Sequence, residues 1–188
     1  YRLVSKKKYE LPEVIVENEL VMTSRANTAG GGKTPHEEQV DVIMSEDVQV
    51  FAAGLGDPSW VVPMARQRGM KVFGLVGSVR HAERQVQAGV DLIVAQGYEG
   101  GGHTGKIANF PLLPQVVDAV SPVPVLAAGG IGDGRGVAAA LSLGAVGAWI
   151  GTAFLVSDEC GIPEISKERI VKGRSEDFDI CRVYSGKT

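Results

Sequence analysis

The chain has few cysteines, no long apolar run and no excess of basic charge. Its two cysteines, Cys160 and Cys181, are too few for a disulfide framework, which favours a cytoplasmic setting. No apolar run reaches the roughly 18 residues that a membrane-spanning helix needs, and no signal-peptide pattern follows the basic start. A formal net charge of −3 does not indicate a nucleic-acid partner. His, Cys and carboxylate residues nowhere show metal-ligand spacing, so no metal is predicted.

Glycine, in contrast, is abundant, and its placement is informative. The 188 residues include 25 glycines, roughly twice the average usage of about 7%. Many of these glycines directly follow short apolar runs that read as strands. The ends of the predicted strands are therefore where we look for a site.

Short apolar runs alternate with helical segments along most of the chain. The runs predict five strands, at Val48–Ala53, Lys71–Val76, Asp91–Ala95, Pro124–Ala128 and Ala145–Ile150. The predicted helices are His36–Ser45, Pro58–Gln67, a helix capped by Ser78 and ending at Gly89, Pro111–Val120, Asp133–Leu143 and one near Ser166–Lys172. A short extended piece is expected near Ile180–Tyr184.

The strands are apolar throughout, which is typical of parallel strands buried on both faces, so the predicted fold class is α/β. Two architectures fit five βα units: an open sheet of flavodoxin type, or part of a (β/α)8 barrel. Pattern alone favours the open sheet, because five strands complete it. The chemistry of the loops favours the barrel.

The loop after the third predicted strand is the first candidate site. It runs from Gln96 to Gly105 as QGYEGGGHTG, with His103 placed directly after three glycines. Glycines let a backbone approach a ligand closely, and an imidazole at a strand's carboxyl end can exchange protons with a bound substrate. The alternative is that His103 is an ordinary surface residue of a loop.

The next two predicted strands also end in glycine turns. Gly129 and Gly130 follow the fourth strand, and Gly151 and Thr152 follow the fifth. In barrels, the loops after the last two strands often bind a phosphate through backbone N–H groups. The alternative is that these glycines only make tight turns.

Two stretches together carry a resemblance to a known family. Gln96–Gly105 and Pro122–Leu155 (PVPVLAAGGIGDGRGVAAALSLGAVGAWIGTAFL) resemble the nitronate monooxygenases, formerly called 2-nitropropane dioxygenases. The flavin-dependent enoyl-acyl-carrier-protein reductases share these motifs. The resemblance implies a (β/α)8 TIM barrel with FMN at its mouth, of which this chain supplies strands four to eight.

The resemblance also implies roles for single residues. His103 corresponds to the family's catalytic histidine. The residues implied to bind the cofactor are Gln96, Gly101, Gly102, Gly129, Gly130, Trp149, Ile150, Gly151 and Thr152. Arg182–Lys187 resembles the segment before the family's C-terminal helix. The family's Ala-Pro-Met turn and its first three strands have no counterpart here, which leaves a fragment, an ordered subset of a longer chain, or completion by a partner chain.

We divide the chain into a lead-in segment (1–45), the βα units of an FMN-binding barrel (46–160) and a polar C-terminal segment of the same domain (161–188). The predicted function is FMN-dependent oxidation of alkyl nitronates with O2. One alternative is an FMN-dependent reductase of an enoyl thioester that uses NAD(P)H, and another is a non-catalytic barrel fragment or partner subunit. The predicted partner is a small-molecule substrate, and a homo-oligomer stays open.

Overall fold

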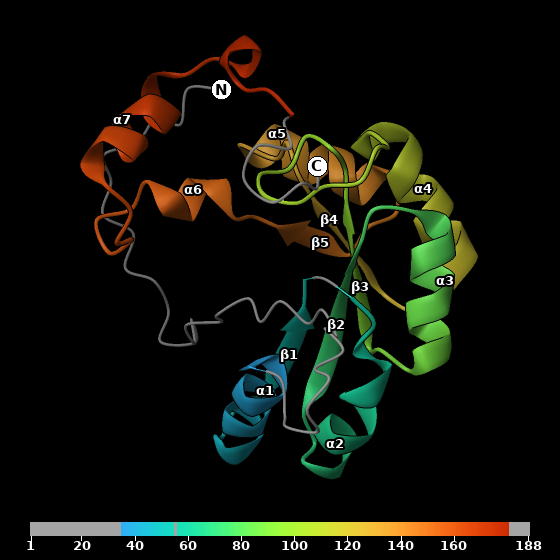
Figure 1. The fold of residues 1–188 in the computed structure, drawn as a ribbon. Helices are drawn as coiled ribbons and strands as arrows, with labels where there is room; N and C mark the ends of the chain where they lie inside the picture. The colour runs from blue at the N-terminus through green and yellow to red at the C-terminus, as the bar shows by residue number, and fades with distance from the viewer. Residues whose placement is uncertain (1–34, 55, 181–188) are drawn as a thin grey trace.

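The computed structural model describes residues 35–54 and 56–180 of the chain (Figure 1). They form one parallel sheet of five strands: β1 (Val50–Ala53), β2 (Lys71–Val76), β3 (Leu92–Gln96), β4 (Val125–Ala128) and β5 (Gly147–Trp149). The helices are α1 (Pro35–Ser45), α2 (Val62–Gln67), α3 (Val79–Ala88), α4 (Asn109–Val120), α5 (Gly134–Ser142), α6 (Thr152–Leu155) and α7 (Glu164–Lys172). Short 3-10 turns lie at Pro58–Trp60 and Ser175–Asp177. The predicted α/β class is confirmed.

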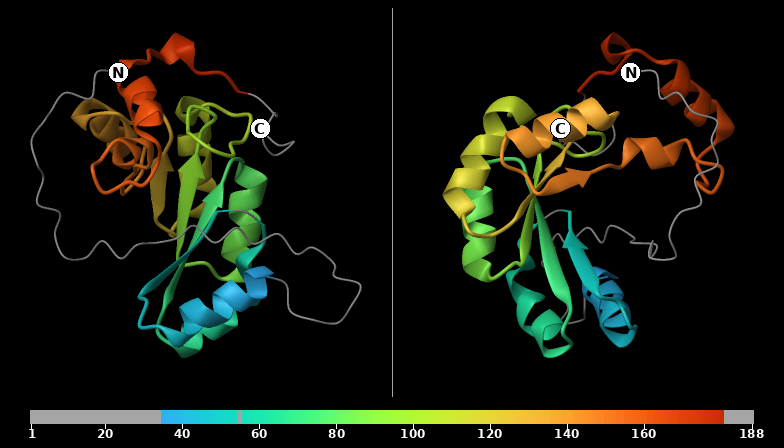
Figure 2. Two further views of the ribbon diagram at one scale, coloured as in Figure 1. Left: turned by 60° about the vertical axis from the view of Figure 1, so that its left-hand side comes forward. Right: turned by 180° about the vertical axis from the view of Figure 1, so that it is seen from behind.

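The strand order decides between the two architectures. The strands follow one another in the order β1-β2-β3-β4-β5, and every neighbouring pair is parallel. A flavodoxin-type sheet has the order 2-1-3-4-5, which requires a reversal that this sheet does not contain. Right-handed crossovers that always step in one direction put the connecting helices on one face, as in a barrel wall. Helices α3 and α4 lie side by side on that outer face (Figure 2).

The two faces of the sheet differ in burial. The outer face packs under the helices, and five of its large side chains are at most 5% exposed: Phe51, Val72, Val76, Ile93 and Val125. The alternate residues point to the inner face. Several of them are half-buried, namely Phe73, Leu75, Leu92, Leu126 and Trp149, whereas Val94 on the central strand is fully buried. The core therefore lies between sheet and helices, and the strands' carboxyl ends carry the loops that matter below.

Local sequence signals account for several element boundaries. Ser78 caps α3 by accepting a hydrogen bond from the His81 amide at 3.4 Å, and Gly89 ends the helix in the left-handed conformation with a φ of 95°. Val40 and Met44 of α1 are buried.

Other boundaries differ from the prediction. Strands β1 and β5 are shorter than expected, the segment Pro58–Gln67 divides into a 3-10 turn and α2, and the short helix α6 was not predicted. Pro63 in the first turn of α2 explains that division, because proline favours a helix start. Residues 1–34 and 181–188 fall outside the described residues, and with them most of the lead-in segment and of the predicted pieces near Ile180–Tyr184 and Arg182–Lys187.

Candidate functional site

The loop between β3 and α4 carries His103 at the carboxyl end of the sheet. The amide of Tyr98 donates to the carbonyl of Ile107 at 3.0 Å, which closes the base of the loop. Within the loop, Gln96 Nε2 donates to the Gly101 carbonyl at 3.2 Å. His103 itself is half-buried. The predicted histidine therefore lies in a structured loop on the face where a barrel binds its ligand.

Glycine backbones from three strand ends pack directly on one another. A Cβ on Gly77, after β2, would lie 2.9 Å from Gly105 Cα. A Cβ on Gly129, after β4, would lie 2.8 Å from the Gly100 nitrogen. The His103 loop is thus held between the turns on either side of it. Gly129 was predicted to contact the cofactor, and this stays a prediction; a side chain there would meet the backbone of the His103 loop. Sequence reasoning missed the close packing of Gly77 on Gly105.

Other glycines of the predicted set face open space. A Cβ on Gly102 or on Gly151 would meet no atom within 4 Å, and a Cβ on Gly101 would meet only Thr152 Oγ1, at 3.3 Å. The Gly101–Thr152 approach joins the loop after β3 to the start of α6. Two segments that are far apart in the sequence and were both predicted to contact a cofactor are therefore brought together.

The turn after β4 also lies against the loop that carries His103. Gly130 adopts a φ of 67°, and a Cβ there would lie 3.1 Å from Glu99 Cβ in the His103 loop. Trp149 is half-buried at the end of β5, and Ile150 is 36% exposed beside it. The loop that carries His103 thus contacts the loops after β4 and β5, and the three form one surface.

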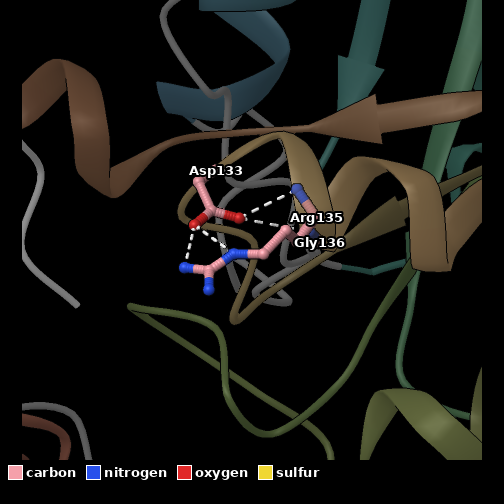
Figure 3. A network of polar contacts seen from close by, with 3 residues as sticks. All are labelled: Asp133, Arg135 and Gly136. Carbon is pink, nitrogen blue, oxygen red and sulfur yellow. Dashed lines mark hydrogen bonds and ion pairs between the residues drawn. The ribbon is translucent and has the colours of Figure 1, made fainter.

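The start of α5 is closed by a carboxylate of this chain (Figure 3). Asp133 Oδ1 accepts hydrogen bonds from the Arg135 amide at 2.9 Å and the Gly136 amide at 3.4 Å, and Oδ2 contacts the Arg135 guanidinium at 2.5 Å. The hydrogen bond from the Arg135 side chain, followed by the backbone bonds, lowers the pKa of Asp133. A phosphate cannot occupy the first turn of α5 without displacing this carboxylate.

A hollow of about 330 Å³ lies beside that pair. Its lining residues come from the turn after β4 and the start of α5: Gly130, Gly132, Asp133, Arg135 and Gly136. Arg135 is the only cation among them, and its side chain is 89% exposed. Arg135 is already paired with Asp133 in this lining, so the two opposite charges face the hollow together.

Sequence reasoning missed two polar residues that organise the site. Asn109, the first residue of α4, hydrogen-bonds the ends of both β3 and β4, and Glu99 accepts from the Asn109 amide at 3.0 and 3.1 Å. This pairing explains why α4 starts at Asn109 rather than at Pro111, since the carboxylate satisfies an N–H that no helical carbonyl can reach. The available signal was an asparagine two residues before a proline at a helix start.

Two classes of feature are absent from the described part of the chain. Residues 35–54 and 56–180 contain no group of three or more His, Cys, Asp or Glu side chains that could hold a metal ion. Among those same residues, no helix has the length and apolar character to cross a membrane.

A sequential parallel sheet with a loop surface at its carboxyl ends defines a βα-barrel type of protein. A family model described as nitronate monooxygenase matches residues 4–188. The chain therefore belongs to the nitronate monooxygenase family, whose members are flavin-dependent oxidoreductases.

Curated relatives cover most of this chain. It is 44% identical over 167 residues to a putative monooxygenase of Mycobacterium tuberculosis, covering 87% of this chain and 44% of that protein. It is 37% identical over 158 residues to a (3aS,4S,5R,7aS)-5-hydroxy-7a-methyl-1-oxo-octahydro-1H-indene-4-carboxyl-CoA dehydrogenase of Rhodococcus jostii, covering 84% and 44% respectively. The chain thus spans less than half the length of these relatives.

Solved structures agree with the barrel assignment. FabK from Thermotoga maritima matches with a TM-score of 0.71 and 40% identity, over 74% of this chain and 45% of that chain. A nitroalkane oxidase of Streptomyces ansochromogenes matches with a TM-score of 0.65 and 35% identity, over 71% and 42%. The five-stranded sheet is therefore part of a TIM barrel, as the loop chemistry indicated.

Proposed function

We propose that the whole protein binds FMN on the loops after β3, β4 and β5 and oxidises alkyl nitronates with O2. The observation that carries the proposal is the packing of Gly101, in the His103 loop, against Thr152: a Cβ on Gly101 would lie 3.3 Å from Thr152 Oγ1. Family membership supports the flavin, and the likeness to a nitroalkane oxidase supports a nitro compound as substrate. A cytoplasmic location belongs to the same proposal and rests on the low cysteine content.

The loop surface fits FMN. Gly102 and Gly151 leave open the space that a side chain would fill, so their backbones are accessible to a ligand. Backbone N–H groups and the Thr152 hydroxyl are donors that suit a phosphate. Because Asp133 closes the start of α5, we assign the phosphate to Gly151 and Thr152, with Gly130 and the Arg135 hollow beside them.

FMN, when bound, supplies the two-electron oxidation of the substrate. His103 supplies what the flavin lacks: an imidazolium stabilises the negative charge of a nitronate, and a neutral imidazole accepts a proton. Gln96 holds the loop's shape by donating to the Gly101 carbonyl. Trp149 and Ile150 provide apolar surface at the end of β5 that helps exclude water from the reacting atoms.

A second function is favoured by one comparison. The Rhodococcus relative, 37% identical, is named as a dehydrogenase of a carboxyl-CoA compound. An FMN-dependent reductase of an enoyl thioester would use NAD(P)H, and His103 would orient the thioester or donate a proton. The same loop surface serves either reaction.

Two measurements on the purified protein test the proposal. An absorption spectrum after reconstitution should show bound flavin, and a protein that stays colourless would favour a non-catalytic barrel fragment or partner subunit. Anaerobic mixing with NADPH then separates the reactions. Fast bleaching of the flavin by NADPH contradicts nitronate oxidation as the function, whereas bleaching only by a nitronate contradicts the thioester reductase.

A further inference from the structure

The side-chain amide of Asn109 lies between the ends of β3 and β4. Its Oδ1 accepts a hydrogen bond from the Gly97 amide at 3.0 Å. Its Nδ2 donates to the carbonyls of Ala128 at 2.8 Å and Gly129 at 2.5 Å. All three of these backbone groups lie where the two strands turn into their loops.

This amide continues the sheet beyond its last backbone pair. The β3–β4 ladder ends at Gln96 and Ala128, and Gly97 N still donates to Ala128 O at 3.1 Å. Beyond that pair, the two strands lead into separate loops. The side-chain amide of Asn109 bridges them with one acceptor and one donor group, as a backbone peptide unit would. An apolar residue at 109 would leave a buried Gly97 N–H with one partner fewer and the Gly129 carbonyl without this donor.

Two neighbouring residues, Glu99 and Gly97, pack closely against Asn109. Glu99 accepts from the Asn109 backbone N–H through both carboxylate oxygens, at 3.0 and 3.1 Å. A Cβ on Gly97 would lie 2.2 Å from Glu99 Oε2 and 2.7 Å from Asn109 Cγ. Only glycine fits at position 97 in this arrangement. We refer to Gly97, Glu99 and Asn109 together as the clamp.

The clamp fixes both ends of the segment that carries His103. Gly97 starts that segment and Asn109 ends it, while the Gly129 bond ties the segment to the turn that Gly130 continues. We propose that Asn109 is a positioning residue, which sets the place of His103 relative to the cofactor surface. This inference rests on the proposed function, because it assigns His103 and the turn after β4 to the same reaction.

Two variants of Asn109 test the role. Asn109→Ala removes both hydrogen-bonding groups. Asn109→Asp keeps the shape and the acceptor, but its carboxylate would face two carbonyls and lie close to Glu99, so the pKa of the new carboxyl should be raised. When protonated, that carboxyl can donate again. A matched control is Val116→Ala, which creates a cavity under the same helix without touching the clamp.

The first readout is hydrogen exchange of residues 97–108 in the flavin-free protein, compared with the unchanged protein at each pH. Asn109→Ala should speed exchange there by roughly tenfold at every pH. Asn109→Asp should match the unchanged protein near about pH 5 and exchange faster near about pH 8, since the carboxyl donates only when protonated. Val116→Ala should not speed hydrogen exchange in residues 97–108 more than in the rest of the protein.

The second readout is flavin reduction by a nitronate in FMN-saturated protein. Asn109→Ala should slow it roughly 10- to 100-fold with little change in KM, because a displaced His103 loses its geometry. Normal exchange in residues 97–108, or an unchanged reduction rate in a folded variant, overturns the inference. If the unchanged protein binds no FMN, the proposed function fails, and the exchange result still decides whether the clamp holds the loop.

Discussion

The ring of Phe73 on β2 meets the ring of Trp149 on β5 edge to face, with centroids 6.5 Å apart and planes at 67°. Strands β3 and β4 lie between these two strands. In a flat sheet, three steps of about 4.8 Å would hold β2 and β5 about 14 Å apart. The sheet therefore curves around its inner face, which is the curvature that a barrel wall requires. The same pair joins the inner face to the start of the loop surface, since Trp149 directly precedes Ile150 and Gly151.

The aromatic pair should contribute measurably to stability. We expect Phe73→Leu to lower the free energy of unfolding by about 1 kcal/mol, because it removes the ring contact while keeping an apolar side chain. Urea unfolding followed by tryptophan fluorescence measures this loss. Phe110→Leu is the control, since Phe110 is 75% exposed and should change nothing. Equal effects of the two substitutions would contradict the account.

Gly129 should tolerate no side chain. Its φ of 95° and the 2.8 Å between an added Cβ and the Gly100 nitrogen both disfavour alanine, so Gly129→Ala should cost more than about 2 kcal/mol of stability. Gly134→Ala is the matched control: a Cβ there meets nothing within 4 Å, and stability should hold or rise slightly. Thermal unfolding of the two variants compares them directly, and a Gly129→Ala protein as stable as the control would refute the backbone packing.

A substitution at Gly151 should weaken cofactor binding without changing the stability of the fold. A Cβ at Gly151 meets no atom of the chain, so Gly151→Ala should change stability by less than about 0.5 kcal/mol. It should still weaken FMN binding, because the methyl group would occupy space that we assign to the ligand. Quenching of flavin fluorescence during titration measures the affinity. Unchanged affinity would remove Gly151 from the cofactor surface.

Asp91 lies at the amino ends of the strands and should make the stability of the protein depend on pH. Burial alone would raise its pKa, but hydrogen bonds from Lys71 Nζ at 2.9 Å and the Val72 amide at 2.9 Å outweigh it, and the pKa is lowered. A lowered folded-state pKa stabilises the protein above the unfolded value of about 3.9, and that contribution is lost as the pH falls through the folded value. Asp91→Asn should therefore be less stable than the unchanged protein at pH 7 and converge with it in acid.

The expected loss is about 1 kcal/mol or less, because Lys71 is 64% exposed and solvent screens the pair. Denaturant unfolding at several pH values measures the difference, with Asp118→Asn on the outside of α4 as control. A constant difference between Asp91→Asn and the unchanged protein down to the most acidic pH would contradict the assignment.

His103 should be needed for turnover but not for holding the cofactor. We expect His103→Ala to keep FMN and lose most of its nitronate oxidation, because general acid–base or charge stabilisation by one side chain contributes typically 10²- to 10⁴-fold. The bound flavin spectrum and steady-state oxygen consumption measure the two properties. Turnover at the original rate would take His103 out of the mechanism.

The sequence predicted elements best where caps and apolar runs coincide. The bounds of the strand Lys71–Val76 were predicted to the residue. Helix α3 begins after Ser78 and ends before Gly89, as these two residues predicted. The choice of a barrel over an open sheet could not come from periodicity, because both architectures use the same βα pattern. It depends on strand order, which long-range pairing sets, and the resemblance of the loops supplied it.

The roles of the predicted site residues stay predictions, but the structure shows where these residues lie. Gly101 and Thr152, both predicted to contact the cofactor, lie close together. The pattern could not show which glycines also pack against the backbone of another loop, as Gly129 does. Asn109 was missed because its partners, Gly97 and Gly129, are brought to it only by the parallel pairing of β3 and β4.

The most direct test is anaerobic mixing of the FMN-loaded protein with an alkyl nitronate in the absence of any nicotinamide. The account predicts that the yellow flavin bleaches, that admission of O2 restores the colour, and that His103→Ala bleaches far more slowly. A flavin that stays oxidised with the nitronate and bleaches only with NADPH would contradict it.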